Sequence, residues 1–169
     1  MLLMGAPGSG KSTQGQMLAE KFGWKWVSTG EILRQSKEPW IMEQMKTAKL
    51  FSDELIFSIL DDALKGVQDA IIDGAVRTEA QAKKALERGT WIDKVVKISV
   101  PEDVLLQRVL ARGRAQDAKE VAEQRFKDYF DNEEKILNIL KDGGVEIVEV
   151  DGTGEPEEVQ EKLLKVINQ

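Results

Sequence analysis

The chain has 169 residues, of which 41% are apolar and 32% charged, proportions typical of a globular protein rather than a disordered one. Its net charge of -6 and its pI near 4.9 argue against a surface that binds nucleic acid. The absence of cysteine excludes disulfides and thiolate metal sites, and the absence of histidine leaves no side chain with an unperturbed pKa near neutrality.

Short apolar runs alternate with helical patterns along the whole chain. Strands are predicted at residues 1–4, 25–28, 70–73, 95–100 and 145–150. Helices are predicted at residues 12–22, 31–35, 40–49, 52–65, 78–88, 102–112, 117–141 and 157–167. Strand–helix alternation of this kind implies a parallel sheet with right-handed crossovers and helices on both faces. We therefore predict a single α/β domain over residues 1–169, built on a five-stranded parallel sheet.

Two of these helices carry signals at their ends. Ser52 is a predicted N-cap, and Asp53 and Glu54 follow it in the first turn, where the helix dipole favours acidic residues. Gly89 is placed to close the helix over residues 78–88, because glycine readily adopts the left-handed conformation found after helix ends.

The segment Gly5-Ala6-Pro7-Gly8-Ser9-Gly10-Lys11-Ser12 matches the P-loop pattern in full, between a predicted strand and a predicted helix. Its glycines allow successive backbone N–H groups to point at one anion, and the helix N-terminus adds a positive dipole end. The alternative is an ordinary glycine-rich turn, but chance should produce this pattern in well under about 1% of chains of this length. The predicted ATP-binding residues here are Gly8, Ser9, Gly10, Lys11, Ser12 and Thr13.

Two side chains are predicted to hold Mg²⁺. The Ser12 hydroxyl can ligate the ion directly, and Asp73, at the end of the third strand, would hold it through water. The alternative for Asp73 is a solvated strand-end residue before Gly74, which is a common turn pair.

Five stretches in chain order resemble adenylate kinase and its nucleoside monophosphate kinase relatives. They are Gly5-Ala6-Pro7-Gly8-Ser9-Gly10-Lys11-Ser12-Thr13-Gln14, Val27-Ser28-Thr29-Gly30-Glu31-Ile32-Leu33-Arg34, Lys49-Leu50-Phe51-Ser52-Asp53-Glu54-Leu55, Asp73-Gly74-Ala75-Val76-Arg77-Thr78-Glu79-Ala80-Gln81-Ala82, and the stretch from Asp93 through Arg125 to the turn Val150-Asp151-Gly152-Thr153. The resemblance therefore covers essentially the whole chain. It implies a P-loop NTPase-type fold and the Mg²⁺-dependent reaction ATP + AMP ⇌ 2 ADP.

The resemblance also implies roles for individual residues. The catalytic residues would be Lys11, Arg77, Arg112, Arg114 and Arg125. Arg108, Arg112 and Gly154 would join the P-loop in binding ATP. The residues that bind AMP would be Thr29, Arg34, Gly74, Arg77 and Gln81. Within that last set, the arginines would hold the AMP phosphate and Gln81 would read the adenine edge.

Several of these residues have simpler interpretations. Thr78 and Gln81 have the spacing of a capping box, so Gln81 could close a helix N-terminus instead. Arg108 and Arg112 are four residues apart and could form a solvated helix face, and Arg34 could be an exposed helix residue. Against these interpretations, six of the seven arginines, all but Arg88, fall on nucleotide positions of the family.

The chemistry of the acceptor suits a chain without histidine. A phosphomonoester has its second pKa near about 6, so AMP is already anionic at pH 7 and needs no general base. The reaction instead needs positive charge between two polyanions. Arginine guanidinium groups supply fixed, protonated donors whose geometry matches phosphate oxygens.

The chain departs from the family in three places. Ala75-Val76 stands where relatives usually carry phenylalanine-proline, and Ser12 stands where they often carry glycine. The acceptor-binding segment, residues 28–55, is reduced. Only a vestigial turn at residues 112–115 remains where relatives carry a lid, with Gly113 alone between Arg112 and Arg114.

Two other functions stay open: a kinase for another monophosphate such as CMP or UMP, and a non-catalytic nucleotide-binding module. The expected partners are ATP, AMP and ADP, with neither nucleic acid nor membrane, and with a second copy of the chain as one means of covering a lidless site. No apolar run approaches the roughly 18 residues of a membrane span, and residues 1–4 do not have the pattern of a signal peptide, so a cytoplasmic location is expected.

Overall fold

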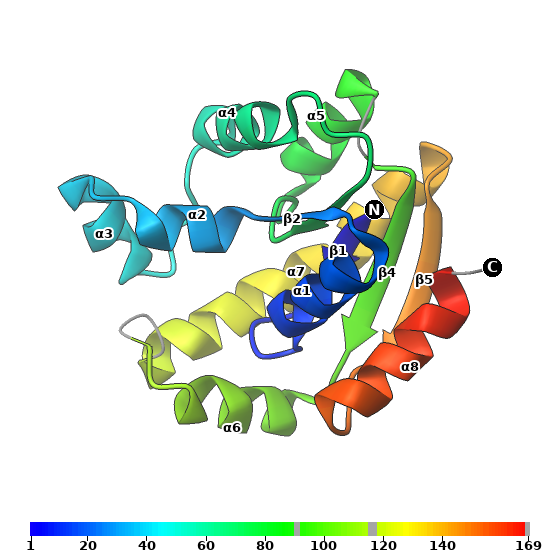
Figure 1. Cartoon of the computed structure of the whole chain (residues 1–169). Coiled ribbons are helices and arrows are strands. Elements are labelled where there is room, and N and C mark those ends of the chain that lie inside the picture. Colours follow the sequence, from blue (N-terminus) through cyan, green and yellow to red (C-terminus); the bar gives the residue numbers. More distant parts are fainter. Residues whose placement is uncertain (90–91, 115–117, 168–169) are drawn as a thin grey trace.

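A five-stranded parallel sheet forms the centre of the computed structural model, which describes residues 1–89, 92–114 and 118–167 (Figure 1). Its strands are β1 (Leu2–Met4), β2 (Lys25–Ser28), β3 (Ala70–Asp73), β4 (Lys94–Ser99) and β5 (Glu146–Asp151). Their order across the sheet is β2-β3-β1-β4-β5, and every neighbouring pair is parallel. The predicted fold class and the five predicted strands are confirmed.

Helices cover both faces of the sheet. They are α1 (Lys11–Phe22), α2 (Thr29–Gln35), α3 (Pro39–Met45), α4 (Asp53–Leu64), α5 (Glu79–Arg88), α6 (Glu102–Ala111), α7 (Lys119–Asp142) and α8 (Pro156–Ile167). α1 and α8 pack on one face, and α4, α5 and α7 pack on the other. α2 and α3 extend away from the sheet in Figure 1 and, with the start of α4, make up the reduced segment at residues 28–55.

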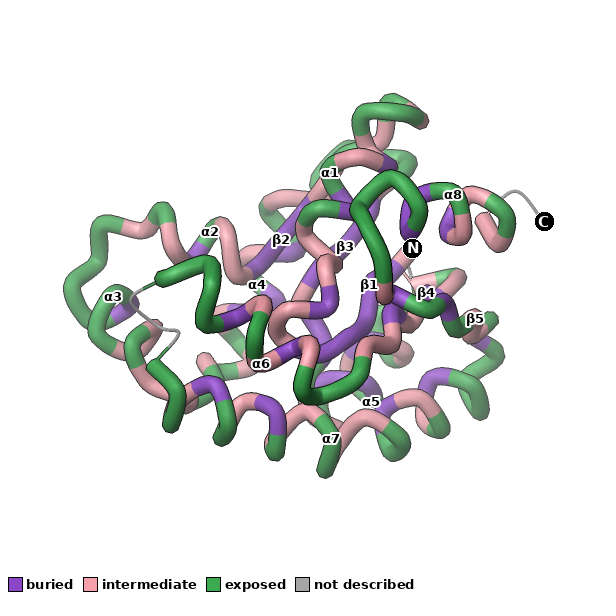
Figure 2. Tube along the Cα trace, turned by 90° about the horizontal axis from the view of Figure 1, so that it is seen from below, coloured by how far each residue is buried: buried purple, intermediate pink, exposed green. Residues whose placement is uncertain are grey.

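Alternation of side chains along the strands builds the two cores. In β1, Leu3 faces α1 and α8, whereas Leu2 and Met4 face α5 and α7. Successive residues of a strand point to opposite faces, so a strand covered on both sides must be apolar throughout. Figure 2 shows this as continuous burial along the central strands and as alternating burial along the helices that cover them.

The strand order places the site. β1 lies at the centre of the sheet, with β2 and β3 on one side and β4 and β5 on the other, so the strand order reverses there. In open parallel sheets, a ligand-binding crevice forms beyond the carboxyl ends of the strands at such a point. Ser28, at the end of β2, is paired in register with Asp73, at the end of β3. The P-loop, the start of α2 and the turn after β3 therefore meet at one edge of the sheet.

The predicted ends of the helices are mostly confirmed, with two differences in the acceptor segment. The Ser52 hydroxyl caps α4, and Gly89 closes α5 with a φ of 69°. α2 begins at Thr29 instead of residue 31, because the Ser28 hydroxyl accepts a hydrogen bond from the N–H of Glu31. The start predicted for the long helix, residue 117, lies outside the described residues.

The helix predicted at residues 40–49 is wrong beyond Met45, where α3 ends. The Thr47 hydroxyl donates to the carbonyl of Gln44 at 2.8 Å and accepts from the N–H of Lys49 at 3.2 Å. Threonine hydroxyls compete in this way with the hydrogen bonds of a helix. Arg125 also donates hydrogen bonds to the carbonyl oxygens of Met45 and Thr47. A residue far away in the sequence therefore helps to hold the end of α3.

Leu140→Ala should lower the free energy of unfolding by about 2–5 kcal/mol, because it leaves a cavity at a side chain that is 0% exposed. The matched control is Leu110→Ala, since Leu110 is 44% exposed and should lose less than about 1 kcal/mol. Urea denaturation followed by circular dichroism measures both. Equal losses in the two variants would contradict the assigned core.

Candidate active site

One cavity of about 630 Å³ lies at the carboxyl edge of the sheet. Every site residue predicted from the sequence lines it: Gly8, Ser9, Gly10, Lys11, Ser12, Thr13, Thr29, Arg34, Asp73, Gly74, Arg77, Gln81, Arg108, Arg112, Arg114, Arg125 and Gly154. Its size lies within the usual range of ligand-binding clefts. The structure thus brings together residues from five helices (α1, α2, α5, α6 and α7), from the end of β3 and from the turns between elements.

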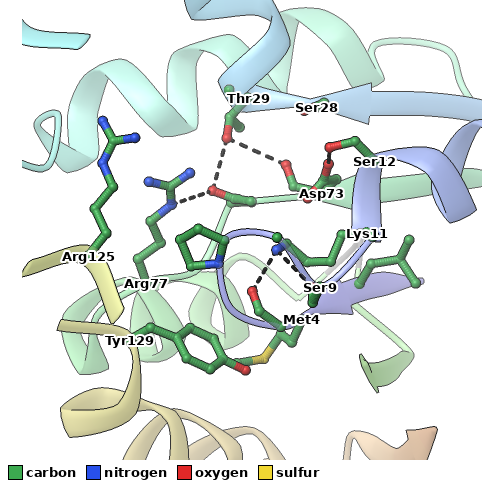
Figure 3. Close-up of a pocket in the computed structure, with 18 of the residues that line it drawn as sticks. Met4, Ser9, Lys11, Ser12, Ser28, Thr29, Asp73, Arg77, Arg125 and Tyr129 are labelled. Atoms are coloured by element: carbon green, nitrogen blue, oxygen red, sulfur yellow. Dashed lines mark hydrogen bonds between the residues drawn. The ribbon is translucent and has the colours of Figure 1, made fainter. Parts of the chain in front are cut away.

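The P-loop wraps tightly around the start of α1. Gly8 and Gly10 have φ values of 85° and 92°, which side chains rarely adopt, and a Cβ on Gly8 would lie 2.8 Å from the carbonyl oxygen of Leu105. The Lys11 ammonium group curls back over the loop and donates to the carbonyl oxygens of Gly5 at 2.6 Å and Ala6 at 3.0 Å (Figure 3). The strongest donor of the loop is therefore held next to the space that the loop encloses.

The structure brings Ser12 and Asp73, the two residues predicted to hold Mg²⁺, into contact. The Ser12 hydroxyl donates to Oδ2 of Asp73 at 2.6 Å, and Asp73 is only 3% exposed. Mg²⁺ prefers oxygen ligands and is commonly held by one or two side chains together with substrate phosphates and water. A hydroxyl and a carboxylate in contact at the edge of a phosphate-binding loop fit that ion.

The turn after β3 joins several of the residues predicted to bind the acceptor. Gly74 accepts hydrogen bonds at its carbonyl oxygen from Thr29 Oγ1 at 2.9 Å and from Arg77 Nε at 3.1 Å. Its φ of 77° favours glycine, and an added Cβ would lie 3.3 Å from both side chains. Arg34 donates to the Glu31 carboxylate at 2.7 and 3.1 Å, a partner whose i, i+3 spacing was visible in the sequence but was missed.

Gln81 takes part in the cap of α5 and also lines the cavity. Its backbone N–H donates to the Thr78 hydroxyl at 3.1 Å, which is the predicted helix cap. Its side chain does not return to Thr78: Oε1 accepts from the N–H of Arg77 at 2.8 Å, and Nε2 donates to Oδ1 of Asp53 at 2.8 Å. The sequence marked Asp53 only as an acidic first-turn residue, so its contact with Gln81 was missed.

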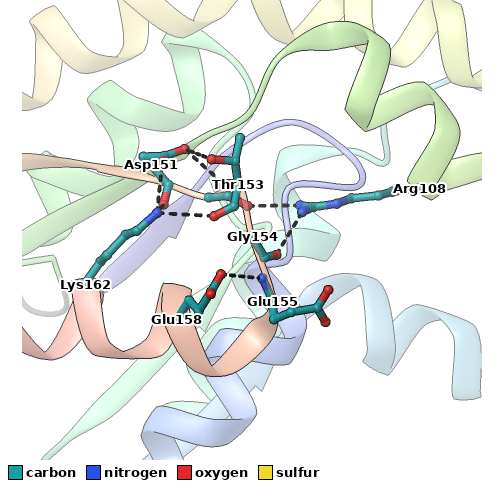
Figure 4. Close-up of polar contacts among 8 residues, drawn as sticks. Arg108, Asp151, Thr153, Gly154, Glu155, Glu158 and Lys162 are labelled. Atoms are coloured by element: carbon teal, nitrogen blue, oxygen red, sulfur yellow. Dashed lines mark hydrogen bonds and ion pairs between the residues drawn. The ribbon is translucent and has the colours of Figure 1, made fainter.

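At the opposite end of the cavity, two cations hold the turn after β5 (Figure 4). Arg108 donates to the carbonyl oxygens of Gly152 at 3.1 Å and Gly154 at 3.3 Å, so it is not simply part of a solvated helix face. Lys162, which sequence analysis did not single out, donates to the Asp151 carboxylate at 2.7 Å and to the carbonyl of Thr153 at 3.2 Å. Hydrogen bonds from Lys162 and Thr153 hold the pKa of Asp151 well below its usual range.

The remaining arginines enter the cavity from the side of α6 and α7. Arg125 donates through Nη2 to the carbonyl oxygens of Met45 at 3.0 Å and Thr47 at 2.8 Å, and thereby links α7 to the acceptor segment. Arg114 lies close enough to Glu31 to affect it: the hydrogen bond from Arg34 is the main cause of the lowered pKa of Glu31, and the charge of Arg114 contributes to the lowering. Residue 115, the end of the predicted vestigial lid turn, lies outside the described residues.

The model of the family described as adenylate kinase matches residues 3–145. The chain belongs to the adenylate kinase family. An adenylate kinase of Mycobacterium bovis (strain BCG / Pasteur 1173P2) is 36% identical over 180 residues, which cover 99% of the chain and 98% of the relative. One from Mycolicibacterium paratuberculosis is 38% identical, covering 97% and 96%, and one from Micrococcus luteus is 33% identical, covering 99% and 89%.

Membership of the adenylate kinase family makes the protein a nucleotide kinase, that is, a phosphotransferase. The P-loop and the α/β fold agree with this assignment. In the part of the chain that the structure describes, no helix combines the length and the apolar character needed to cross a bilayer.

Burial and neighbouring charges lower the pKa of Lys11, the P-loop lysine of this adenylate kinase family member. Burial lowers the pKa of Lys11 from 10.5 to about 8, the Asp73 carboxylate acts in the opposite direction, and Arg77 and Arg112 lower the pKa further. Phosphate oxygens would favour the charged ammonium, so a bound triphosphate should raise this pKa again. Nucleotide binding should then be coupled to proton uptake wherever the free protein holds Lys11 neutral.

We therefore expect ATP binding at pH 9 to take up close to one proton per site, because a group with a pKa of about 8 is then about nine-tenths neutral. At pH 7 the same group is already protonated and uptake should be small. Calorimetric titration in two buffers of different ionisation enthalpy measures the difference. Lys11→Arg is the control, since a guanidinium stays protonated at both pH values, and uptake that persists in this variant would show that another group is responsible.

Proposed function

We propose that this protein transfers the γ-phosphoryl group of ATP to AMP, with Mg²⁺ as the metal ion. The observation that carries the proposal is that one cavity is lined both by a P-loop and by a second set of cationic side chains, Arg34 and Arg77, which suit a second phosphate. A protein that only binds ATP has no need of the second set. The proposal also places the protein in the cytoplasm, where ATP is available as a substrate.

In the proposed reaction, a phosphate oxygen of AMP attacks the γ-phosphorus of ATP. The bond between that phosphorus and the β,γ-bridging oxygen breaks as the new P–O bond forms, and two molecules of ADP result. The nucleophile is already ionised at neutral pH, so no side chain has to remove a proton. The work of the protein is to align the two nucleotides and to stabilise negative charge during the transfer.

The contacts within the cavity support the proposed roles of the cations. Lys11 and Arg77 donate hydrogen bonds to backbone carbonyl oxygens at 2.6–3.1 Å. In the proposed complex, phosphate oxygens would accept hydrogen bonds from the same donor groups. Exchange of a neutral carbonyl for an anionic phosphate oxygen strengthens each hydrogen bond. Arg112 and Arg114 line the cavity from the connection between α6 and α7, and Arg125 lines it from α7. We assign Arg112 to the ATP phosphates, and Arg114 and Arg125 to the transferring group.

Ser12 and Asp73 would hold Mg²⁺, the Ser12 hydroxyl directly and Asp73 through water, and the ion would neutralise charge on the β- and γ-phosphates. Gln81 and Thr29 lie on the acceptor side of the cavity and are assigned to AMP. Arg108 and the turn at Gly152 to Gly154 lie on the donor side and are assigned to ATP.

The proposal is tested by incubating the protein with ATP, Mg²⁺ and one monophosphate at a time, and following ADP by ³¹P NMR. We expect ADP with AMP, and much less diphosphate with CMP or UMP. A second arm omits Mg²⁺ and should abolish turnover. Equal use of all three monophosphates would favour a less specific kinase, and absence of turnover with any of them would leave a nucleotide-binding module.

Arg77→Ala should raise the KM for AMP more than it weakens ATP binding, because only the acceptor phosphate loses a partner. Loss of a charge-assisted hydrogen bond costs roughly 1.5–3 kcal/mol, or about 10- to 150-fold. Arg88→Ala is the matched control, since the Arg88 guanidinium pairs with Asp61 and Arg88 is not among the residues lining the cavity. A drop in ATP affinity without a rise in the KM for AMP would show that Arg77 serves the donor instead.

The short connection between α6 and α7 leads to a prediction about water. The connection covers residues 112–118, too few to fold over a nucleotide as a separate lid, yet Arg112 and Arg114 within it and Arg125 beyond it are kept. A lid normally excludes water during transfer. We expect either that a second copy of the chain covers the site, so that the active enzyme is an oligomer, or that ATP is measurably hydrolysed without AMP.

Light scattering and an ATPase assay without AMP decide between these outcomes when run on the same sample. Dilution that lowers the mass and raises the ATPase activity together would support cover by a second copy. A strict monomer that hydrolyses no ATP would contradict both alternatives and would show that the single chain excludes water by itself.

A further inference from the structure

We infer that Asp53 determines acceptor-base specificity by fixing the orientation of the Gln81 amide. This inference rests on the proposed function, in which Gln81 reads the base of the acceptor. Asp53 is the first residue of α4, directly after the N-cap Ser52, and no nucleotide contact is assigned to it. It is a positioning residue: it acts on the base through Gln81.

Opposed partners hold the two ends of the Gln81 amide. On one side, Asp53 Oδ1 accepts a hydrogen bond from Nε2 at 2.8 Å, and an ionised carboxylate can only accept. On the other side, the backbone N–H of Arg77 donates to Oε1 at 2.8 Å, and a backbone N–H can only donate. Rotation of the amide by half a turn would place its NH₂ group against the N–H and its oxygen against the carboxylate. One orientation is therefore strongly favoured.

The Gln81 amide, held in one orientation, can still offer one hydrogen-bond donor and one acceptor to a ligand. An amide NH₂ has two donors and an amide oxygen has two lone pairs, so one donor and one acceptor remain after the two internal bonds. Gln81 lines the cavity although it is only 2% exposed, so a base would have to approach closely. An adjacent donor and acceptor match a base that presents an acceptor and a donor side by side.

Adenine presents this pattern, with its 6-amino group next to a ring nitrogen that accepts. A 6-oxo purine presents a carbonyl oxygen in place of the amino group, and its N1 carries a proton. Pairing with a 6-oxo purine would require the reversed amide, which Asp53 and the N–H of Arg77 both oppose. The geometry thus favours 6-aminopurine monophosphates over 6-oxopurine monophosphates, and inosine monophosphate (IMP) is the matched probe because it lacks the 2-amino group of guanine.

Asp53 also has a structural role that the test must separate. It is an acidic residue at a helix N-terminus, and its bond to Gln81 ties α4 to α5 across 28 positions of the chain. Loss of either contribution would lower stability and would affect all acceptors alike. Only the positioning role changes the ratio between two acceptor bases.

The experiment measures kcat/KM for AMP and for IMP, with ATP and Mg²⁺, in the full chain. Asp53→Ala should lower the AMP-to-IMP ratio about tenfold, the effect expected when one hydrogen bond to a charged group no longer fixes the amide. Asp53→Asn should restore most of the ratio, because it can present its carbonyl oxygen to Gln81 at the same length. Glu54→Ala is the matched control: it removes the neighbouring first-turn acid, is not hydrogen-bonded to Gln81, and should leave the ratio unchanged.

The outcomes separate the inference from the proposed function. A wild-type protein that makes no ADP from AMP overturns the proposed function. A wild-type protein that does so, with an unchanged ratio in Asp53→Ala, overturns only the role of Asp53. If Asp53→Ala does not fold, Asp53→Ser carries the same expectation, since serine suits a first turn but is too short to reach Gln81, and an unchanged ratio there is equally decisive.

Discussion

The main constraint on this structure is that several positively charged side chains lie close together at one edge of the sheet, in a protein whose net charge is negative. Lys11 and several arginines lie around one cavity, and each guanidinium or ammonium group needs an oxygen partner when it is taken out of water. Backbone carbonyl groups supply most of them: those of Gly5 and Ala6 for Lys11, and that of Gly74 for Arg77. Carbonyl oxygens hold the cations in position without neutralising them, so the site keeps its attraction for phosphate.

This arrangement couples the site to the position of the acceptor segment. Arg125 donates to the carbonyl groups that end α3, across about 80 residues of sequence, while the Asp53–Gln81 bond ties the start of α4 to α5. Arg125 and Gln81 also line the cavity, so the residues that hold the acceptor segment in place are the same residues that a bound ligand would contact.

The sequence was sufficient for features that depend on local patterns. The five strands, the P-loop and the cap at Ser52 each follow from neighbouring residues, and the strand ends then bring Ser12 and Asp73 together. Features that depend on distant partners were not predictable. Arg125 holds the end of α3 from a distance, in addition to the local hydrogen bonds of Thr47. Asp53 holds the Gln81 amide through a contact that no spacing rule for helices describes. Lys162 was missed because a lysine on an amphipathic helix usually faces solvent.

The cations around the cavity lie on elements of the central fold or directly beside them. Lys11 lies on α1, Arg77 just before α5, Arg108 on α6 and Arg125 on α7, all elements of the central fold. The alignment with the M. bovis relative runs over 180 positions, more than the 169 residues of this chain, so that relative carries residues that this chain lacks. Placement of these cations is thus a property of the sheet and the helices packed on it. A lid normally excludes water during phosphoryl transfer. Under the proposed function, that task falls here to the residues around the cavity or to a second copy of the protein.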